Sequence, residues 1–416
     1  MLIEFAVKNY ACFRDRQAIS LVVPAKMASK KDIATGFVRA PYVSRVAAIF
    51  GANASGKSKF LEAFNFGSQF IVSPHDAFRD NQVPYRPFAL SDEGHREPTE
   101  FSFIFVSDDQ LFEYSFAVDA KEVVFESLVV TPKGGRRQQL ISRTRSSELP
   151  TINKKIKGDR KVWAETVKPN RLLLTHIHNL KSEALSSAFS WFENSAFIRD
   201  MDELPEVFTG DVLSKPKFKK RILSLLKNFD LFVDDIEVKE IPLQLDDIPE
   251  EVMSHLKKVV AKEGGAGSFV TQRVRFGHRT SANKLAFFPL ELESDGTRRL
   301  FAFAYPWLDI LAKRLVVLID EIDRSLHPLI VRFFVKQINS ASSNKAQSQL
   351  IFTTHDISLL DEDVLDRHQI WLLDRGKSQD SRLFSLLDFK PRKGEALAKG
   401  YLAGRYGGIP ILTEID

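Results

Sequence analysis

Short apolar runs separated by polar turns characterise the first 130 residues. The run VAAIF at 46–50 predicts a buried strand that leads directly into a glycine-rich loop and then a helical pattern. Residues 2–8 and 19–23 also predict strands. Three further β-rich runs follow, with short polar turns between them, at 101–106, 113–119 and 122–130. We therefore expect a strand–loop–helix unit combined with an antiparallel meander.

The pattern changes at residue 131 and again at residue 286. The middle zone mixes basic loops with helices, and one helix carries apolar residues on a single face, at Phe218, Ile222, Leu225, Leu226 and Phe229. Buried strands then alternate with helices again, at 315–320, 348–355 and 368–374. That alternation is typical of a parallel sheet. We predict an α/β fold with a mixed or parallel core sheet, an antiparallel β subdomain and a helical insertion, in domains 1–130, 131–285 and 286–416.

Composition narrows the setting of the protein without deciding its function. The 416 residues are 44% hydrophobic and 27% charged and include one cysteine, Cys12, so no disulfide framework is expected and a reducing cytoplasm fits. The N-terminus lacks the basic and apolar regions of a secretory signal. The most apolar later stretch is interrupted by Pro306, Asp309, Lys313 and Arg314. We expect a cytoplasmic protein without a membrane segment.

Positive charge is unevenly distributed along the chain. The net charge is only +5, but basic residues outnumber acidic ones between Lys133 and Arg171, and 215–227 adds a second cluster. This distribution allows DNA or another nucleic acid as a partner. The alternative is an ordinary solvated face.

The segment GANASGKS, residues 51–58, matches G-x-x-x-x-G-K-S at every fixed position, between a predicted strand and a helix. Gly51 and Gly56 let the backbone N–H groups face one point, where phosphate oxygens can accept them. Lys57 supplies a cation to the β- and γ-phosphates of ATP, and the Ser58 hydroxyl can bind Mg²⁺. The alternative is a turn that merely starts a helix. The predicted nucleotide-binding residues here are Gly51, Asn53, Ala54, Ser55, Gly56, Lys57, Ser58 and Lys59.

Two adjacent carboxylates end the apolar run LVVLID at 315–320. Asp320 is positioned to bind Mg²⁺ directly or through water, and Glu321 to orient the attacking water as a catalytic base. Adjacent carboxylates at the end of a buried strand are costly unless a cation or water network receives them. The alternative is an acidic cap on the strand.

Histidine follows the next predicted strand, in IFTTHD at 351–356. His355 would lie at the sheet edge where nucleotides bind in open α/β folds, within reach of the γ-phosphate or its attacking water. A packed core histidine or a helix cap is the alternative. The histidines of HIH at 176–178 lack a ligand set with metal spacing, so we interpret them as structural.

A second possible anion site lies in SDGTRRL, residues 294–300. Ser294, Gly296 and Thr297 would expose hydroxyl and N–H groups at the start of a helix. Two half-sites on one chain suggest a twofold dimer in which each turn covers the partner's γ-phosphate. An ordinary N-capped helix is the alternative.

Taken in order, these motifs resemble the ABC-type ATPases of the SMC, RecF and OLD branch. The resemblance rests on KNYACF (8–13), the Walker A segment 51–58, the signature-like ESDGTRRL (293–300), the Walker B segment 315–323, RSLHP (324–328) and TTHD (353–356). It implies an ABC-type P-loop head in which Ser294 and Gly296 act in trans, Glu321 is the base, and Asp323 to His327 contact the partner subunit. The signature lacks the Gly-Gly-Gln form of transporters, and Gln82 is only a candidate for the Q-loop.

The chain more narrowly resembles the stand-alone bacterial ATP-binding proteins of the AAA/AbiLi type, encoded beside RloB-like or TOPRIM nuclease effectors in phage defence. The ending KGYLAGRYGGIPIL, 399–412, carries this likeness, as a partner dock or as a last packed strand. It implies an ATPase switch that dimerises or oligomerises with ATP and holds or releases a separate effector. A DNA-repair ATPase of RecF or SMC type is the alternative, and a transporter motor is a third class that the signature disfavours.

Overall fold

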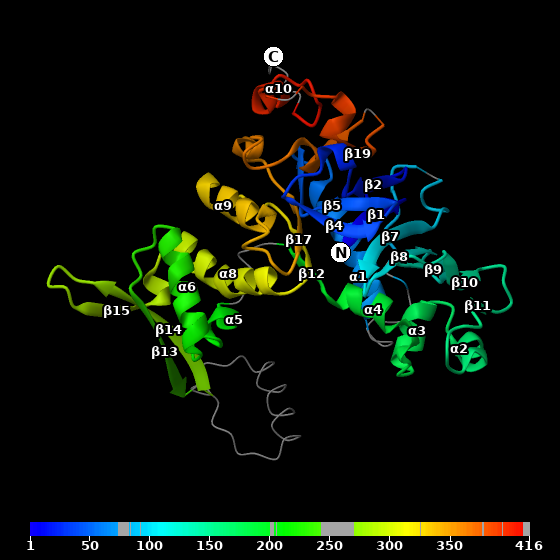
Figure 1. The fold of residues 1–416 in the computed structure, drawn as a ribbon, viewed down its shortest axis with the longest axis horizontal. Coiled ribbons are helices and arrows are strands. Elements are labelled where there is room, and N and C mark those ends of the chain that lie inside the picture. Colours follow the sequence, from blue (N-terminus) through cyan, green and yellow to red (C-terminus); the bar gives the residue numbers. More distant parts are fainter. Residues whose placement is uncertain are drawn as a thin grey trace. The chain divides into compact units, whose positions relative to one another are not determined.

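Six strands form the core sheet of the computed structural model, with β6 (Val46–Gly51) near its centre (Figure 1). The strand order is β12-β16-β17-β6-β18-β19, and every neighbouring pair is parallel except β18 with β19. The other strands are β12 (Ser195–Ile198), β16 (Val316–Ile319), β17 (Gln349–Thr353), β18 (Ile370–Arg375) and β19 (Ser381–Ser385). Strands buried on both faces read as continuous apolar runs, which is why 46–50 and 315–320 were recognisable. The predicted α/β class with a parallel core sheet is confirmed.

The structure describes residues 1–73, 83, 85–91, 93–199, 204, 206–242, 270–324, 326–376, 378–392 and 394–410. The chain divides into two compact units. The first unit comprises Met1–Asp200 and Ile310–Asp416, and the second comprises Met201–Asp309.

A seven-stranded antiparallel sheet forms the other layer of the first unit, in the order β11-β10-β9-β8-β7-β1-β2. Its strands are β1 (Leu2–Lys8), β2 (Gln17–Ser20), β7 (Thr99–Ser107), β8 (Gln110–Val118), β9 (Val123–Pro132), β10 (Gln138–Thr144) and β11 (Thr151–Ile152). The predicted meander is β7–β8–β9, and its antiparallel pairing is confirmed. The predicted strand 19–23 is divided between β2 and β3 (Val22–Val23). A small sheet joins β3 to β5 (Ala40–Ser44) and β4 (Asp32–Phe37).

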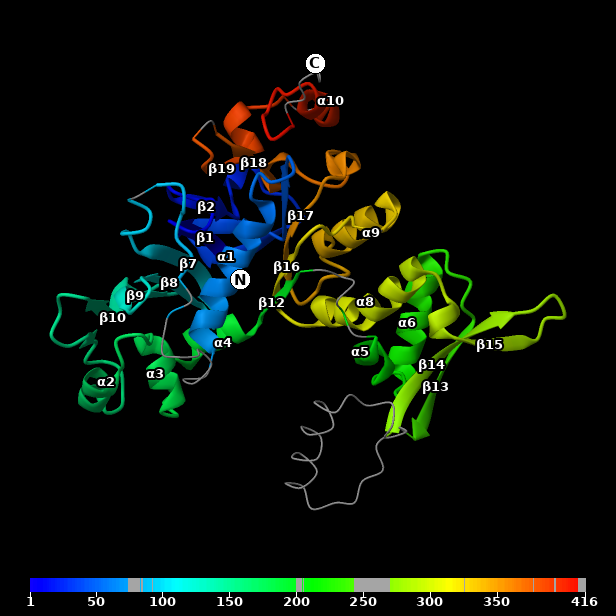
Figure 2. The same cartoon turned by 180° about the vertical axis from the view of Figure 1, so that it is seen from behind.

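Helix α1 (Lys57–Val72) lies between the two large sheets of the first unit (Figure 2). Phenylalanine rings fill its interface with the antiparallel sheet: the ring of Phe5 is 5.4 Å from that of Phe60 and 5.0 Å from that of Phe64. A Cβ at Gly67 would lie 2.9 Å from the ring of Phe103, so α1 approaches this sheet as closely as a helix backbone can. The helix that follows the glycine-rich loop is therefore held from both sides.

A buried carboxylate connects the meander to the helices that follow it. Glu126 of β9 accepts hydrogen bonds from the backbone N–H groups of Leu173 (2.7 Å) and Leu174 (3.0 Å) and from the Tyr114 hydroxyl (2.8 Å). Burial raises the pKa of Glu126. These bonds join α3 to the sheet. Besides α1, the described α-helices of the first unit are α2 (Arg160–Thr166), α3 (Leu173–Asn179), α4 (Ser186–Glu193), α9 (Pro328–Asn339) and α10 (Leu397–Leu402).

The second unit holds a three-stranded antiparallel sheet, β13-β14-β15, that the hydrophobic pattern did not reveal. Its strands are β13 (Asp235–Pro242), β14 (Val270–Arg279) and β15 (Leu285–Pro289), and its helices are α5 (Val207–Gly210), α6 (Pro216–Asn228) and α8, which begins in this unit (Asp295–Ala312). The ring of Phe276 on β14 meets that of Phe301 on α8 edge-on, at 5.2 Å.

The two compact units differ from the three predicted zones. Residues 131–199 of the predicted insertion belong to the first unit. In this range β10 continues the ladder of the meander, Glu126 binds α3, and β12 pairs with β16 of the core sheet. The start of the predicted C-terminal zone, up to Asp309, belongs with the second unit. As a division into domains, 1–130, 131–285 and 286–416 stays a prediction. Among the described helices, none is both long enough and apolar enough to cross a membrane.

Candidate nucleotide site

The loop between β6 and α1 needs glycine at both predicted positions. A Cβ at Gly51 would lie 2.4 Å from the Leu373 carbonyl oxygen and 2.7 Å from Ser55 Oγ. Gly56 has a φ of +105°, and a Cβ there would lie 2.6 Å from Cys12 Sγ. Neither contact could be tolerated by a larger residue without moving the loop. The loop geometry therefore depends on neighbouring backbone as well as on its own sequence.

Lys57, the first residue of α1, turns its ammonium group back into the loop. Its Nζ donates hydrogen bonds to the carbonyl oxygens of Gly51 (2.8 Å) and Ala52 (2.9 Å), and the residue is only 6% exposed. Burial lowers the pKa of Lys57, while the nearby Glu321 and Asp320 oppose that shift. A buried cation with carboxylates around it provides an electrostatic site for a phosphate group.

One threonine of the neighbouring strand forms hydrogen bonds with both acidic residues that follow β16. Thr353 Oγ1 donates to Asp320 Oδ1 (2.5 Å) and accepts the backbone N–H of Glu321 (2.7 Å). Asp320 is 8% exposed, and Glu321 has a φ of +47°, in the left-handed region that is uncommon for residues with side chains. Thr353 thus positions the Asp320 carboxylate and the backbone of Glu321, a role that the motif TTHD contained but that spacing alone did not indicate.

His355 follows β17 beside the same acidic residues. Its backbone N–H donates to both carboxylate oxygens of Asp323, at 3.3 and 3.2 Å. Burial lowers the pKa of His355, the Lys57 charge lowers it further, and the acidic side chains of Asp323, Glu321 and Asp320 oppose the shift. The imidazole is therefore biased toward its neutral form.

The parallel sheet explains why these residues meet. Ile319 of β16 pairs with Phe352 of β17, and Thr353 of β17 pairs with Ile49 of β6. The three strands end at one edge, where ligands bind in open α/β sheets.

In the glycine-rich loop, Ser55 is buried, Ser58 and Lys59 are half-buried, and Asn53 and Ala54 are exposed.

The signature-like turn lies in the second unit and caps α8. Ser294 Oγ accepts the backbone N–H of Thr297 (3.2 Å) and contacts Thr297 Oγ1 at 2.9 Å. Gly296 has no positive φ, and a Cβ there would meet only Ser294 Oγ, at 3.9 Å. The turn is thus a working helix cap, yet the described residues give no steric reason for a glycine at position 296.

The C-terminal turn packs directly on the glycine-rich loop, which the sequence did not indicate. Gly408 has a φ of +69°, and a Cβ there would lie 3.6 Å from Gly51 Cα. The Tyr401 hydroxyl donates to the Gly408 carbonyl oxygen at 2.8 Å, and the Tyr401 ring lies 6.0 Å from that of Phe50. The C-terminal ending, which the structure describes as far as Pro410, therefore helps to support the glycine-rich loop.

Two other candidates from the sequence have clear outcomes. His176 Nε2 lies 2.8 Å from Thr166 Oγ1, and the His178 ring stacks on Phe189 at 3.6 Å, so both histidines have packing roles in the first unit. Gln82, the Q-loop candidate, lies outside the described residues.

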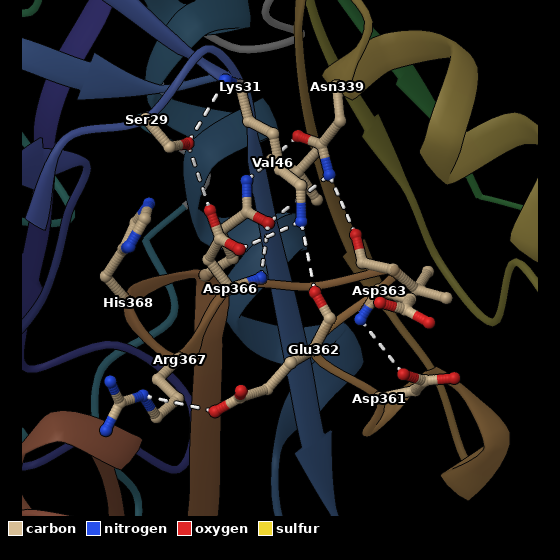
Figure 3. Close-up of polar contacts among 12 residues, drawn as sticks. Ser29, Lys31, Val46, Asn339, Asp361, Glu362, Asp363, Asp366, Arg367 and His368 are labelled. Carbon is tan, nitrogen blue, oxygen red and sulfur yellow. Dashed lines mark hydrogen bonds and ion pairs between the residues drawn. The ribbon is translucent and has the colours of Figure 1, made fainter. Parts of the chain in front are cut away.

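One acidic cluster away from the glycine-rich loop has the spacing of a cation site. Ligand atoms of Asp32, Asp366 and His368 lie within 4.8 Å of one another. Figure 3 shows that Lys31 already reaches this cluster, and its Nζ donates to Asp366 Oδ1 at 2.8 Å and to the Glu362 carbonyl oxygen at 3.2 Å. Asp366 therefore already has a protein cation, and Asp32 Oδ1 lies 3.1 Å from His368 Nε2, so we interpret the cluster as a connection between β4 and the loop before β18.

The geometry above can be compared with known proteins. Residues 46–361 match the family model AAA_21, described as "AAA domain, putative AbiEii toxin, Type IV TA system". The chain belongs to the AAA_21 family. This AAA_21 chain accordingly contains an ATP-binding P-loop ATPase domain, and the matched residues include the glycine-rich loop, both carboxylates and His355. A search of curated proteins gives no match.

Several solved structures match the AAA_21 chain at low identity and with low TM-scores. The "SMC head domain from Thermotoga maritima" is 13% identical with a TM-score of 0.38, over 92% of this chain and 98% of that one. The "recombination mediator protein RecF-ATP" is 12% identical with a TM-score of 0.35, over 92% and 97%. The cbiO1 protein from Clostridium perfringens, part of the ABC transporter complex cbiONQ, is 14% identical with a TM-score of 0.31, over 98% and 97%.

The electrostatics of His355 can be tested by NMR. In the nucleotide-free protein we expect a His355 pKa below the ordinary 6.5, and Lys57→Ala should raise it because the repelling ammonium is removed. A lowered folded-state pKa means that this contribution to stability is present above pH 6.5 and is lost as the pH falls through the folded-state pKa. A ¹H–¹³C titration, assigned with His355→Gln, measures this. A pKa of 6.5 or above, or one that does not respond to Lys57→Ala, contradicts the description.

The support given by the C-terminal turn can be tested with two tyrosines. Tyr401→Phe removes the hydrogen bond to Gly408, so we expect a loss of about 1 kcal/mol in the free energy of unfolding and a several-fold weaker ATP affinity by calorimetry. Tyr406→Phe is the matched control, because its hydroxyl donates to Glu395 Oε1 at 2.6 Å. Equal effects of both variants on ATP affinity would mean that Tyr401 has no special connection to the loop.

Proposed function

We propose that this protein is an ATP-binding and ATP-hydrolysing molecular switch that dimerises or oligomerises with ATP and controls a separate effector in anti-phage defence. One observation carries the proposal: Asp320 and Glu321 lie at the same sheet edge as the buried ammonium group of Lys57, near enough to act on its charge. The family description, which names a toxin of a Type IV toxin–antitoxin system, supports the defence setting.

The proposed reaction assigns a role to each converging group. Backbone N–H groups of Asn53 to Ser58 and the Lys57 ammonium bind the β- and γ-phosphates of ATP. Hydroxyl and carboxylate oxygens are ligands that Mg²⁺ prefers, so Ser58 and Asp320 would hold the metal, which neutralises phosphate charge when bound.

Hydrolysis then needs a base beside the γ-phosphate. Glu321 takes a proton from a water whose oxygen forms the new bond to the γ-phosphorus, the bond from that phosphorus to the β–γ bridging oxygen breaks, and ADP and phosphate leave. His355, neutral, hydrogen-bonds the γ-phosphate or this water. The contacts of Thr353 support this division, because its hydroxyl binds the Asp320 carboxylate but only the backbone of Glu321, which leaves the Glu321 carboxylate free of Thr353.

The signature turn supplies the argument for association. A glycine in a helix costs about 0.5–1 kcal/mol relative to alanine, and Gly296 lies in α8 with space for a Cβ. Its own unit therefore gains nothing from this glycine. Close approach of an outside group does require a residue without a side chain. We infer that Ser294, Gly296 and Thr297 cover the ATP of a partner copy, and that Asp323 to His327 contact that partner.

The proposed effector is a separately encoded nuclease of RloB-like or TOPRIM type. Within the described residues the one cluster with cation-site spacing is Asp32, Asp366 and His368, which Lys31 already occupies, so this part of the chain offers no nuclease centre of its own. A DNA-repair ATPase is the second candidate, and the basic surface described in the next subsection favours it. Release of a separate effector on ATP turnover would favour the switch, and ATP turnover that acts on DNA without any effector would favour the repair ATPase.

Nucleotide chemistry is tested by two substitutions with different outcomes. Lys57→Ala should weaken ATP binding at least about tenfold, equivalent to 1.4 kcal/mol, because the phosphates lose their buried cation. Glu321→Gln should keep ATP affinity but slow turnover about 10²-fold or more, because water loses its base. Calorimetry and phosphate release measure these effects. Unchanged affinity in the first variant, or normal turnover in the second, contradicts the assignment of that residue.

The role of Gly296 is tested by separating stability from association. Gly296→Ala should raise the free energy of unfolding by about 0.5 kcal/mol, while light scattering in Mg-ATP shows less of the larger species than wild type, best compared in the Glu321→Gln background. Gly134→Ala, at an exposed turn of the first unit, is the control for association. If Gly296→Ala associates normally, the turn is an ordinary helix cap and has no role in association.

A further inference from the structure

Helix α6 in the second unit has one face that is packed and one that is not. Ile222, Leu225 and Leu226 are buried, and the Phe218 ring meets Tyr305 of α8 edge-on at 5.4 Å. Figures 1 and 2 both show α6 beside α8 and over the β13–β14 hairpin. The buried face accounts for the apolar helical spacing seen in the sequence.

The opposite face of α6 is strongly basic. Residues 215–228 contain six lysine and arginine residues and no acidic residue. Lys217, Lys220 and Arg221 are exposed and stand three and four positions apart, so they share one side of the helix. A helix that needed only solubility would usually alternate charge signs along its exposed face.

Most of this charge has no ion-pair partner among the residues that the structure describes. Lys219 pairs with Asp235 at 2.7 Å and Lys227 with Asp234 at 3.5 Å. For Lys217, Lys220 and Arg221 no ion pair exists with any residue that the structure describes. These three cations are available to a partner.

The basic face borders an open hollow of about 480 Å³. Lys219, Lys220 and Lys227 line it, and Ser224 and Asn228 add hydrogen-bonding groups. Lysine ammonium groups act as mobile point charges, and hydroxyl and amide groups donate to phosphate oxygens. The chemistry of the hollow fits a chain of phosphates.

The first basic zone, 133–171, is a poorer candidate in the structure. Arg137 pairs with Glu113, and Arg145 contacts both Asp119 and Glu122. Arg143 instead donates to backbone carbonyl oxygens, among them that of Arg171 at 2.7 Å. These arginines stabilise the β-meander, so their positive charge is largely used within the first unit.

We propose that the exposed face of α6 binds the sugar-phosphate backbone of double-stranded DNA without reading its sequence. The face presents cations at helical spacing and carries no exposed aromatic ring, whereas proteins that bind single strands stack bases on aromatic side chains. The proposal goes beyond the switch function and does not depend on the identity of the effector.

The position of α6 makes DNA a candidate input to the switch. Thr209 Oγ1, just before α6, donates to the Ala302 carbonyl oxygen of α8 at 3.1 Å, and Glu206 pairs with Arg298 of α8 at 2.9 Å. The helix that receives DNA therefore packs on the helix that carries Ser294 and Gly296. Coupling between two ligands is reciprocal, so DNA that favours association would itself bind more tightly in ATP.

The test is fluorescence anisotropy with a labelled 30-base-pair duplex and the full chain, over a range of salt concentrations. Triple charge reversal at Lys217, Lys220 and Arg221 to Glu should raise Kd at least about tenfold and reduce the slope of log affinity against log salt by about 2–3, since each phosphate contact contributes about 0.9. ATP affinity should stay unchanged, which separates a failure here from a failure of the nucleotide site.

A matched control uses Arg136, Lys154 and Lys157, which are exposed and have no ion pair among the described residues. Reversing three charges in either set takes the net charge from +5 to −1, since 5 − 6 = −1. Equal losses from both variants would make the effect one of general charge and overturn the proposal. If the α6 variant folds poorly by circular dichroism, the same positions changed to Gln provide the test, with a smaller expected loss.

Other results would also overturn the assignment. If the wild-type protein does not bind the duplex with or without ATP, the proposed DNA site is wrong. Preference for single-stranded DNA that is lost on Phe232→Ala would place recognition on that exposed ring in the loop after α6. Displacement of the DNA by an RNA duplex at lower concentration would assign the face to RNA.

Discussion

The structure depends on one buried ammonium group at the edge of a parallel sheet. Lys57 is turned back onto the carbonyl oxygens of Gly51 and Ala52, where it has little contact with water. Removing this charge from water is unfavourable, and the carboxylates after β16 offset part of that cost. The arrangement leaves a positive centre in the glycine-rich loop, which is where the phosphates of ATP are proposed to lie. The contacts of Gly56 with Cys12 and of Gly51 with the C-terminal turn hold the loop in that form.

The two units divide the proposed work between them. The first unit contains the groups proposed to bind and hydrolyse the chain's own ATP. The second contains the signature turn and the basic face of α6, connected through contacts of α6 and Thr209 with α8. A partner's ATP and a DNA duplex would thus act on the same small unit. This division suits a switch, because the groups proposed for ATP hydrolysis and the surfaces proposed to contact a partner or DNA lie on different parts of the chain.

Motif spacing predicted much of the nucleotide site because the fold converts sequence order into position. A strand, a glycine-rich loop and a helix in succession can produce few geometries, so Gly51, Gly56 and Lys57 were recognisable. The strand-end positions of Asp320 and His355 followed from parallel strands that share one edge. The role of Thr353 could not be predicted, because its hydroxyl acts on a neighbouring strand 33 residues away in sequence.

Other features arise from contacts that no local pattern records. The packing of Gly408 on Gly51 joins residues at opposite ends of the chain. The attachment of α3 to the meander involves Glu126, a buried carboxylate in an otherwise ordinary strand. The two basic zones looked alike in sequence. In the structure, Arg137, Arg143 and Arg145 of 133–171 are used in contacts of the meander, whereas three cations without an ion pair among the described residues share one face of α6.

The central claim is that a working ATP site is shared between two copies of the chain. The most direct measurement is ATP turnover in a mixture of Lys57→Ala, which keeps its signature turn, and Ser294→Arg, which keeps its glycine-rich loop. Each variant alone should be nearly inactive. The account predicts that mixing restores turnover, because a mixed dimer contains one site with both halves intact. A mixture that stays inactive although mixed dimers form, or a Ser294→Arg protein that is fully active alone, would contradict the account.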